Sequence, residues 1–441
     1  MTARTKPSTG TFSALRNLHF RIYFAGQLAS TSGAWMQSIA QGWLVYQLTH
    51  SELWLGIVAC ATGLPLLLLS PVAGVLVERV SRRHMMIVTQ TIQMILAFIL
   101  AALTVTNTVQ IWHIVVLALL LGITNAVDSP ARIALTADLV EREQLPSGIA
   151  LSSILINGSR VIGPAVAGVV LTTWGPSWCF FLNGLSFLAV IASLLAIKVK
   201  PIQRFIASES PLLQLRAGLH YALTHSLILP LLLLTANAGL LGIGVLTLTP
   251  AYAAVILHSP TNGYVLVNAA NGLGAVMAAF LMGLFARRIG LARTVALMAL
   301  LTAVSMGLLA STATVATASS ISFVFGLTLI TQFVGASTLI QLEVPSAFRG
   351  RVLALYSLAF AGLTPFGSLA LGLIAALIGI ATTILVTAIV SGLVSLVILL
   401  RWAALWQRRV HEKATEKVDA SRETARKPGW TTDTQSVLGE D

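Results

Sequence analysis

Residues 53–83 read LWLGIVACATGLPLLLLSPVAGVLVERVSRR, an apolar run that ends in a cluster of arginines. The apolar part, residues 53–77, exceeds the roughly 20 residues that an α-helix needs to cross about 30 Å of hydrocarbon. Lys and Arg concentrate in the short cytoplasmic loops of membrane proteins. The stretch therefore predicts a transmembrane helix followed by a cytoplasmic loop that carries Arg79, Arg82 and Arg83.

The same pattern recurs along the whole chain of 441 residues, and we expect an all-α integral membrane protein. Basic residues lie in alternate gaps between the apolar stretches and in both tails, and Arg160 is the exception among the 27. This alternation predicts a multi-pass protein of the cytoplasmic (inner) membrane with both termini in the cytoplasm. The twelve expected transmembrane helices cover about residues 22–48, 53–77, 85–106, 111–133, 146–173, 176–198, 227–257, 261–286, 291–311, 315–341, 346–376 and 380–406.

The composition excludes several other classes of protein. With 56% hydrophobic and 10% charged residues, a single soluble core would leave large apolar patches in water. The net charge of +12 lies in short loops that face anionic headgroups, so nucleic acid is not an expected partner. Cys60 and Cys179 fit no disulfide framework or metal-ligand spacing. We expect no metal and no cofactor, and no cleaved signal peptide because the first helix is a retained span.

Two features of the first half return in the second half at nearly the same offset. Gly74 corresponds to Gly283, and Pro164 corresponds to Pro365. Duplication of a six-helix unit is typical of carriers that rock two halves about a central site. The predicted parts are a cytoplasmic tail (1–21), a six-helix bundle (22–198), a central cytoplasmic loop with an amphipathic helix (199–226), a second, pseudo-symmetric bundle (227–406) and a disordered cytoplasmic tail (407–441).

The motif GVLVERVSRR, residues 74–83, resembles the loop signature of the major facilitator superfamily. The resemblance implies the major facilitator fold and a cytoplasmic gate, in which the positive loop residues reach carboxylates and Asp128 completes a charge relay with Glu78 and Arg82. Simple anchoring of a positive loop at the inner membrane surface is the alternative. The expected gate residues are Gly74, Glu78, Arg79, Arg82, Arg83 and Asp128.

The segment NGSRVIGPAVAGVV, residues 157–170, resembles the glycine-proline motif of exporters in the same superfamily. Gly163 permits close helix packing, and Pro164 removes a backbone hydrogen bond, so we expect a hinge here and a second one at Pro365. Residues 128–168 and 344–372, together with 12–30, resemble the branch that contains enterobactin exporters and macrolide efflux proteins.

Polar residues recur at helical spacing within several of the apolar stretches. Such residues are costly in lipid, so each stripe is expected to face protein or water. We interpret the Gln and Asn side chains as the lining of a water-accessible substrate cavity, whereas single Ser and Thr residues are better explained by bonds to their own backbone. The candidate cavity residues are Gln27, Gln37, Gln41, Asn157, Arg160, Asn268, Asn271 and Gln332.

Arg160 is the strongest single candidate. It lies past the middle of the fifth apolar stretch, where an isolated arginine costs about 2.5 to 3.5 kcal/mol on insertion scales. No Asp or Glu stands at the same depth, so the sequence favours an anionic, catechol-bearing or neutral lipophilic cargo over a cationic drug. The alternative is a structural arginine that bonds backbone carbonyl groups or Asn157.

These observations predict a secondary transporter that exports a small amphipathic molecule, with a siderophore-like anion as the first candidate and the proton gradient as the energy source. A multidrug or macrolide efflux pump is the alternative, and a non-transporting membrane receptor or scaffold is a further one. The chain lacks the GxxxxGK[ST] loop of ATP-driven pumps and any catalytic cluster at one depth, so we do not expect an enzyme. Oligomeric state is not indicated.

Overall fold

The computed structural model describes residues 12–197 and 211–402, and all regular elements in these ranges are helical. The parts of the predicted tails and central loop that fall at 1–11, 198–210 and 403–441 lie outside the described residues. The first half comprises η1 (Ser13–Arg16), α1 (Leu18–Thr49), α2 (Glu52–Arg79), α3 (Arg82–Val105), α4 (Ile111–Asp138), η2 (Arg142–Gln144), α5 (Leu145–Thr173) and α6 (Pro176–Ala196).

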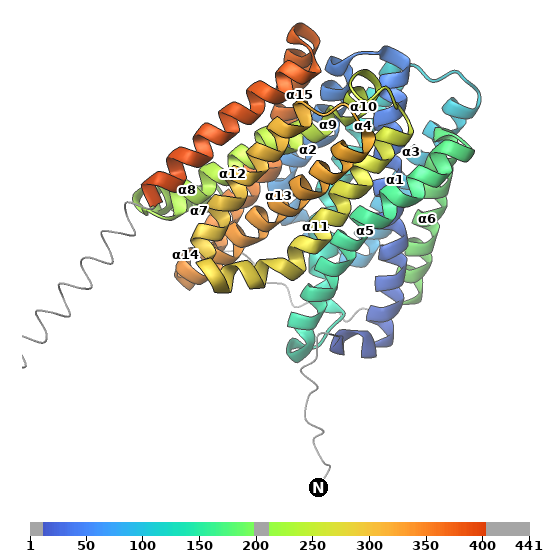
Figure 1. The fold of residues 1–441 in the computed structure, drawn as a ribbon. Helices are drawn as coiled ribbons and strands as arrows, with labels where there is room; N and C mark the ends of the chain where they lie inside the picture. Colours follow the sequence, from blue (N-terminus) through green and yellow to red (C-terminus); the bar gives the residue numbers. More distant parts are fainter. Residues whose placement is uncertain (1–11, 198–210, 403–441) are drawn as a thin grey trace, which may run out of the picture. The chain divides into compact units, whose positions relative to one another are not determined.

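The second half contains more breaks, because its first and fifth long segments each include a π-helical turn. Figure 1 shows the helices coloured in chain order, from blue near the N-terminus to red near the C-terminus. The final helix covers Ile380–Trp402. The other elements are α7 (Pro211–Thr224), α8 (Ile228–Asn237), η3 (Ala238–Gly242), α9 (Ile243–Thr247), α10 (Thr249–Val255), α11 (Asn262–Ile289), α12 (Leu291–Ala310), α13 (Val315–Glu343), α14 (Ser346–Ser357), η4 (Leu358–Gly362) and α15 (Thr364–Ile378).

Ten of the described segments are long and apolar enough to span a membrane, and the bent helix α11 makes an eleventh. Helix α1 has 32 residues but is not among them, because its polar residues lower the mean hydropathy. Counting α1 completes the twelve segments that the sequence predicts. A polar first helix has to be shielded from lipid by other helices or by water.

One helix is longer than the sequence indicated. The fourth apolar stretch was expected to end at residue 133, directly after Arg132, but α4 continues to Asp138. The extra turns bury Leu135, and Arg132 forms an ion pair with Asp128 one turn earlier on the same helix. An i,i+4 ion pair and an apolar face both favour helix, so the charge of Arg132 does not mark its end.

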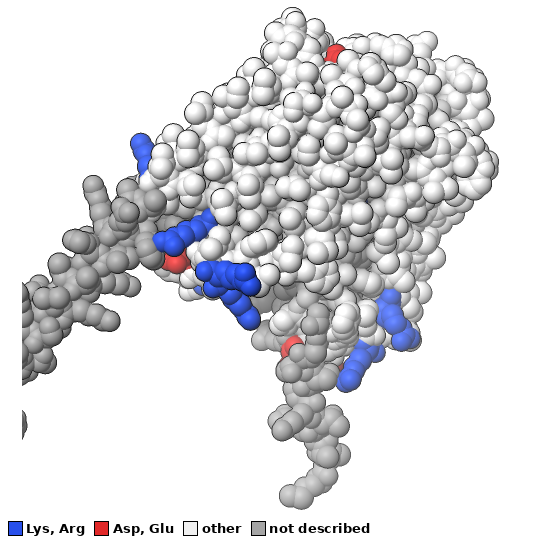
Figure 2. All heavy atoms as spheres, in the orientation of Figure 1, with Lys and Arg blue, Asp and Glu red and all other residues white. Residues whose placement is uncertain are grey.

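Charge is unevenly distributed along the helices. Lys and Arg gather toward the lower end of the face in Figure 2, below a broad uncharged surface. We call this the basic end, defined by the α2–α3 connection at Arg79–Arg82 and the α11–α12 connection at Ile289–Leu291. Exposed apolar side chains such as Phe280 (74%) and Leu377 (75%) cover the sides, as expected for helices that lipid surrounds.

The two halves meet mainly away from the basic end. There α2 packs on α15, α5 packs on α11, and α1 packs on α10. One buried apolar cluster includes residues of both halves, among them Leu44, Leu171, Leu248 and Leu371. Nearer the basic end, the first half has its own cluster around Phe20, Met86, Leu135 and Leu194. The division into two duplicated bundles remains a prediction.

Helix α7, predicted as an amphipathic helix of the central loop, packs against α14. The ring of Tyr221 stacks on that of Phe348, with centroids 4.9 Å apart and planes 12° from parallel. Gly218 lies against Arg351, so the backbone of α7 approaches α14 closely. The described part of the central loop is therefore attached to the second half.

Candidate functional site

Arg160 lies near the middle of α5, with its guanidinium group over the indole ring of Trp35 on α1. The guanidinium carbon is 5.1 Å from the ring centroid. Arg160 is half-buried and makes no hydrogen bond or ion pair with any residue in the described ranges. A cation over an aromatic face gains roughly 0.5 to 2 kcal/mol, and the N–H donors of the guanidinium remain available to a ligand.

Close contact between α1 and α5 fixes this pair. A Cβ atom at Gly163 would collide with Trp35 and with the backbone of α1 at Ser32 and Met36, so only glycine fits there. The hydroxyl of Ser32 donates a hydrogen bond to Ser159 across the same contact, at 3.2 Å. These small residues bring the two helices together and place the indole beneath the guanidinium.

Helix α11 of the second half contacts α5 beside Arg160. A Cβ atom at Gly272 would collide with the Arg160 carbonyl oxygen and contact Val161, so the backbones of α5 and α11 touch there. Asn268 lies one turn from Gly272, on the side away from the basic end. The Arg160 site therefore lies where α1, α5 and α11 converge.

The end of the site remote from the basic end is closed by contacts between the halves. Tyr264 of α11 donates a hydrogen bond to the carbonyl oxygen of Ile39 at 3.1 Å, and Trp43 donates to Thr261 at 3.2 Å. Toward the basic end, added Cβ atoms at Gly74, Gly158 and Gly283 would meet no atom within 4 Å. The site is thus closed on the side away from the basic end.

Three predicted cavity residues are instead buried between helices, which corrects their assignment. Gln37 accepts a hydrogen bond from Asn183 of α6 at 2.6 Å, and Gln332 donates to the carbonyl of Leu234 at 2.9 Å. Gln27 is 2% exposed. A polar side chain in a span avoids lipid equally well against another helix or against water, so helical spacing alone did not separate the two locations.

The remaining candidates differ in exposure and in the hydrogen bonds that their side chains already make. Gln41 is half-buried. Asn157 and Asn268 are half-buried and donate to carbonyl groups one turn earlier on their own helices, at 2.9 Å each. Asn271 donates to the carbonyl of Ser322 and belongs to the contact between α11 and α13. Gln41, Asn157, Arg160 and Asn268 are the predicted residues that remain as candidates for the cavity.

The predicted charge relay has different partners in the structure. Asp128 is fully buried and binds Arg132 at 2.6 Å, whereas Arg82 pairs with Asp138 at 2.5 Å. Asp128 and Arg82 therefore belong to separate ion pairs in this conformation. Asp138 was missed because the helix was expected to end before it. The side chain of Glu78 lies outside the described part of the structure.

The other gate residues also depart from expectation. Arg83 donates to the carbonyl groups of Leu194 and Leu195 at 2.6 and 2.9 Å, and so caps the carboxyl end of α6. Arg79 is exposed. Gly74 was expected to allow close helix approach, yet no atom lies near it in this conformation. Their role as a gate remains a prediction.

The predicted hinge residues lie at close helix contacts. Pro164 is buried within α5, next to Gly163. Pro365 lies in the first turn of α15, directly after the π-turn η4, and its ring fills the space that a side chain at Gly63 would need. That they serve as hinges remains a prediction, although π-turns of this kind are frequent at functional sites.

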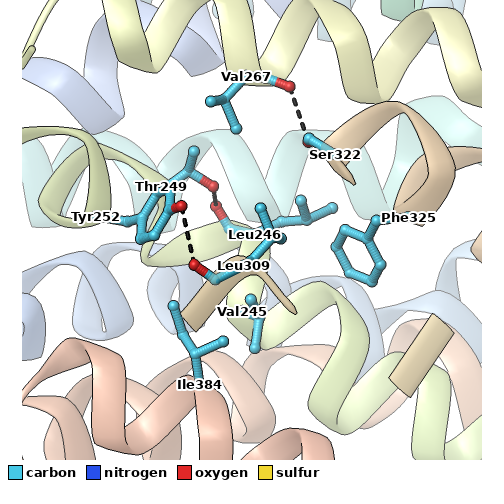
Figure 3. Close-up of a pocket in the computed structure, with 9 residues that line it drawn as sticks. All are labelled: Val245, Leu246, Thr249, Tyr252, Val267, Leu309, Ser322, Phe325 and Ile384. Carbon is cyan, nitrogen blue, oxygen red and sulfur yellow. Dashed lines mark hydrogen bonds between the residues drawn. The ribbon is translucent and has the colours of Figure 1, made fainter. Parts of the chain in front are cut away.

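A small cavity within the second half is not a candidate for cargo (Figure 3). Its volume of about 20 Å³ would hold about one water molecule. The hydroxyl groups of Thr249, Tyr252 and Ser322 all donate to backbone carbonyl groups. In the described ranges, no group of three or more His, Cys, Asp or Glu side chains could hold a metal ion.

The structure thus has a half-buried arginine within a membrane span and two halves that meet mainly away from the basic end. Comparison with known proteins places the chain in a family. Residues 9–425 match the family described as transmembrane secretion effector. The chain belongs to this family. These secretion effectors are a branch of the major facilitator superfamily, whose members are transporters and not enzymes.

The chain is similar to transporters of several cargoes. It is 31% identical to the staphyloferrin A transporter of Staphylococcus aureus, over 44% of this chain and 49% of that protein. It is 26% identical to an enterobactin exporter of Citrobacter koseri, over 61% and 64% of the two chains. With macrolide efflux protein A of Streptococcus pyogenes, identity is 28% over 40% and 43%. The aligned segments thus cover between about two fifths and two thirds of these relatives.

Solved structures show the same fold at low sequence identity. A transporter of the POT family in complex with 5-aminolevulinic acid superposes with a TM-score of 0.69 at 13% identity, over 89% of this chain and 97% of that one. The nucleoside transporter NupG superposes with a TM-score of 0.66 at 13% identity, over 88% and 99%. The chain therefore has the all-helical major facilitator fold.

Proposed function

We propose that this protein is a secondary transporter that exports a small amphipathic anion, siderophore-like in chemistry, in exchange for protons. The observation that supports the proposal best is Arg160, which lies at membrane depth over Trp35 with no carboxylate partner among the described residues. Helices α1, α5 and α11, which converge on it, contain no Asp or Glu.

Electrostatics favours an anion at such a site. An arginine within a membrane has to be offset by a partner, and the indole ring supplies only part of the stabilisation. Carboxylate or catecholate oxygens would accept charge-assisted hydrogen bonds from the guanidinium, and these are roughly twice as strong as neutral ones. A cationic drug would be repelled. The relatives named for staphyloferrin A and enterobactin are consistent with this choice.

The conformation suits the loading step of export. If the basic end faces the cytoplasm, as the distribution of Lys and Arg favours, the closed end faces outward. The Tyr264 to Ile39 contact then shuts the outer side. Cargo would enter from the cytoplasm, reach Arg160 and leave after the halves rock about the site.

A macrolide-like cargo is the second candidate, and an aromatic cluster in the second half supports it. The rings of Phe333 and Phe360 have centroids 4.2 Å apart, and Tyr356 lies beside Phe333 with centroids 5.1 Å apart. Such a surface suits a large apolar molecule. The similarity to macrolide efflux protein A agrees with this reading.

Everted membrane vesicles test both proposals. Vesicles with an acidic lumen would be supplied with labelled staphyloferrin A, labelled enterobactin, a labelled macrolide or a cationic dye. We expect gradient-dependent accumulation of one siderophore. Arg160→Ala should lower its apparent affinity about ten- to a hundredfold, since a hydrogen bond to a charged group contributes roughly 1.5 to 3 kcal/mol.

The matched control is Arg288→Ala, which removes an exposed positive charge at the basic end. It should leave siderophore affinity unchanged. Accumulation of the macrolide or dye that is indifferent to Arg160→Ala would contradict the anion proposal and favour broad efflux. Binding of a siderophore without accumulation would favour a receptor.

A further inference from the structure

The first half contains a buried acid that cargo recognition does not use. The side chain of Asp128 on α4 is fully buried, about ten residues or 15 Å along the helix from its end at Asp138. One carboxylate oxygen accepts hydrogen bonds from Thr89 at 2.8 Å and Gln90 at 2.9 Å, and the other binds Arg132 at 2.6 Å. Both oxygens of this buried carboxylate are therefore paired.

Arg132, the ion-pair partner of Asp128, is more exposed than Asp128 itself. The side chain of Arg132 is 30% exposed, and its Nε atom has no hydrogen-bond partner. Arg132 therefore lies between the buried acid and the surface of the protein. If Asp128 takes up a proton, the guanidinium is able to turn outward and regain hydration, so the released positive charge is not trapped in the interior.

A polar connection leads from Asp128 to α1. Gln90, which donates to Asp128, accepts a hydrogen bond from Ser30 at 3.3 Å. Beside Ser30 on α1, the buried atoms Gln27 Nε2 and Thr31 Oγ1 have no hydrogen-bond partner among the described residues. Buried polar groups are nearly always paired, and ordered water completes the pairing where the protein does not.

This line of polar groups points toward the cargo site. Gln27, Thr31 and Trp35 follow one another at four-residue spacing, so they lie on one face of α1 over about 12 Å. Trp35 supports the guanidinium of Arg160. One face of α1 thus runs from the neighbourhood of Asp128 to the residue that holds the proposed cargo-binding arginine.

We propose that Asp128 is the proton-carrying group of this transporter, and that the Gln27–Thr31 face of α1 links it to the Arg160 site. The inference rests on the proton-driven export proposed above. A proton that enters from outside adds to the carboxylate oxygen that binds Arg132 and breaks that ion pair. Its release to the cytoplasmic side restores the carboxylate and the pair, as in the conformation described here.

Two charged or titratable groups, Arg132 and Tyr23, interact with Asp128 among the described residues. Arg132 lies on the same helix, and Tyr23 of α1 lies within electrostatic range of both Asp128 and Arg132. Helix α3 faces Asp128 with the neutral side chains of Thr89 and Gln90. The other charged or titratable residues on the helices packed against α4 are His19, Arg21, Tyr46, Glu52, Cys60, Glu78, Arg79, Arg82, Arg83, His84 and Arg160.

Purified protein in proteoliposomes tests the proposal with labelled staphyloferrin A and labelled enterobactin as probes. Two rates are measured, accumulation driven by a proton gradient and exchange of labelled for unlabelled probe without a gradient. Asp128→Asn keeps the shape and the hydrogen-bonding capacity but cannot ionise. We expect it to abolish gradient-driven accumulation and to retain exchange. Asp138→Asn, on the same helix, breaks the ion pair with Arg82 but should keep the gradient dependence, so it separates the loss of an ion pair from the loss of the proton-carrying acid.

The outcomes separate the two proposals. If the wild-type protein accumulates neither probe under a gradient, proton-driven export of siderophores fails. If the wild type does so and Asp128→Asn accumulates probe equally, the role of Asp128 is overturned while the export function stands. If Asp128→Asn does not fold, Thr89→Val replaces it. Loss of one hydrogen bond to the carboxylate should lower gradient-driven accumulation and retain exchange without a gradient, and unchanged accumulation would contradict the proposal.

Discussion

The hydroxyl group of Tyr264 on α11 donates a hydrogen bond to the carbonyl oxygen of Ile39 on α1, at 3.1 Å. Both groups are buried, and they belong to different halves of the chain. A Cβ atom at Gly42 would lie 2.9 Å from the same hydroxyl, so a bulkier residue there would displace it. The contact holds the halves together at the end remote from the basic end.

Tyr264→Phe should weaken this closure by about 1 kcal/mol, the usual net contribution of a hydrogen bond. The population should shift toward the conformation that is closed at the basic end. A cysteine introduced as Gly158→Cys, with Cys60 and Cys179 replaced, would report the shift as slower alkylation from the basic end. Tyr252→Phe is the control, because its hydroxyl binds Leu309 within the second half. An equal change in both variants would contradict the assignment.

Trp35 should matter for cargo through Arg160. Trp35→Leu removes the aromatic face and should weaken anion binding by about 0.5 to 2 kcal/mol, because the guanidinium loses its cation–π support. Trp35→Phe should weaken it less. Equilibrium binding of labelled siderophore to purified protein is the measurement. In an Arg160→Ala background, Trp35→Leu should have little further effect, and additive losses would show that the two residues act independently.

Packing of α11 on α13 depends on glycine. A Cβ atom at Gly326 would enter the backbone of Asn271 well inside 3.0 Å, so neither helix can yield without moving. Gly326→Val should lower stability by about 1 to 3 kcal/mol through overpacking. Gly283→Val is the comparison, since its Cβ atom would meet nothing within 4 Å. Thermal unfolding in detergent measures both, and similar unfolding temperatures would count against this packing.

The ion pair between Arg82 and Asp138 should stabilise the present conformation. Their side chains are 18% and 21% exposed, so solvent screens the pair only in part. A double-mutant cycle with Arg82→Gln and Asp138→Asn should give a coupling energy of about 0.5 to 1.5 kcal/mol. Chemical unfolding in mixed micelles supplies the four stabilities. A coupling near zero would indicate that the pair contributes nothing in solution.

Residue type was enough to nominate candidates for the site, but it did not decide which of these candidates belong to it. Arg160 stood out because an arginine in the middle of an apolar stretch is costly wherever it lies. Gln37 and Gln332 are also polar residues within apolar stretches, but they form buried hydrogen bonds between helices. Thr89, Gln90 and Asp138 were not recognised, although Thr89 and Gln90 form part of a polar face on α3. The importance of Thr89 and Gln90 depends on their hydrogen bonds to Asp128, and that of Asp138 depends on its ion pair with Arg82.

The sequence by itself determined the membrane class, the helical architecture and the resemblance to exporters, because lipid imposes length, apolarity and placement of charge on each helix separately. Tertiary structure alone decided that Arg82 binds Asp138 and not Asp128, that Trp35 lies beneath Arg160, and that the halves meet at Tyr264. Those relationships depend on which faces of different helices come together. A hydrogen bond or ion pair between helices leaves no periodic trace in either segment.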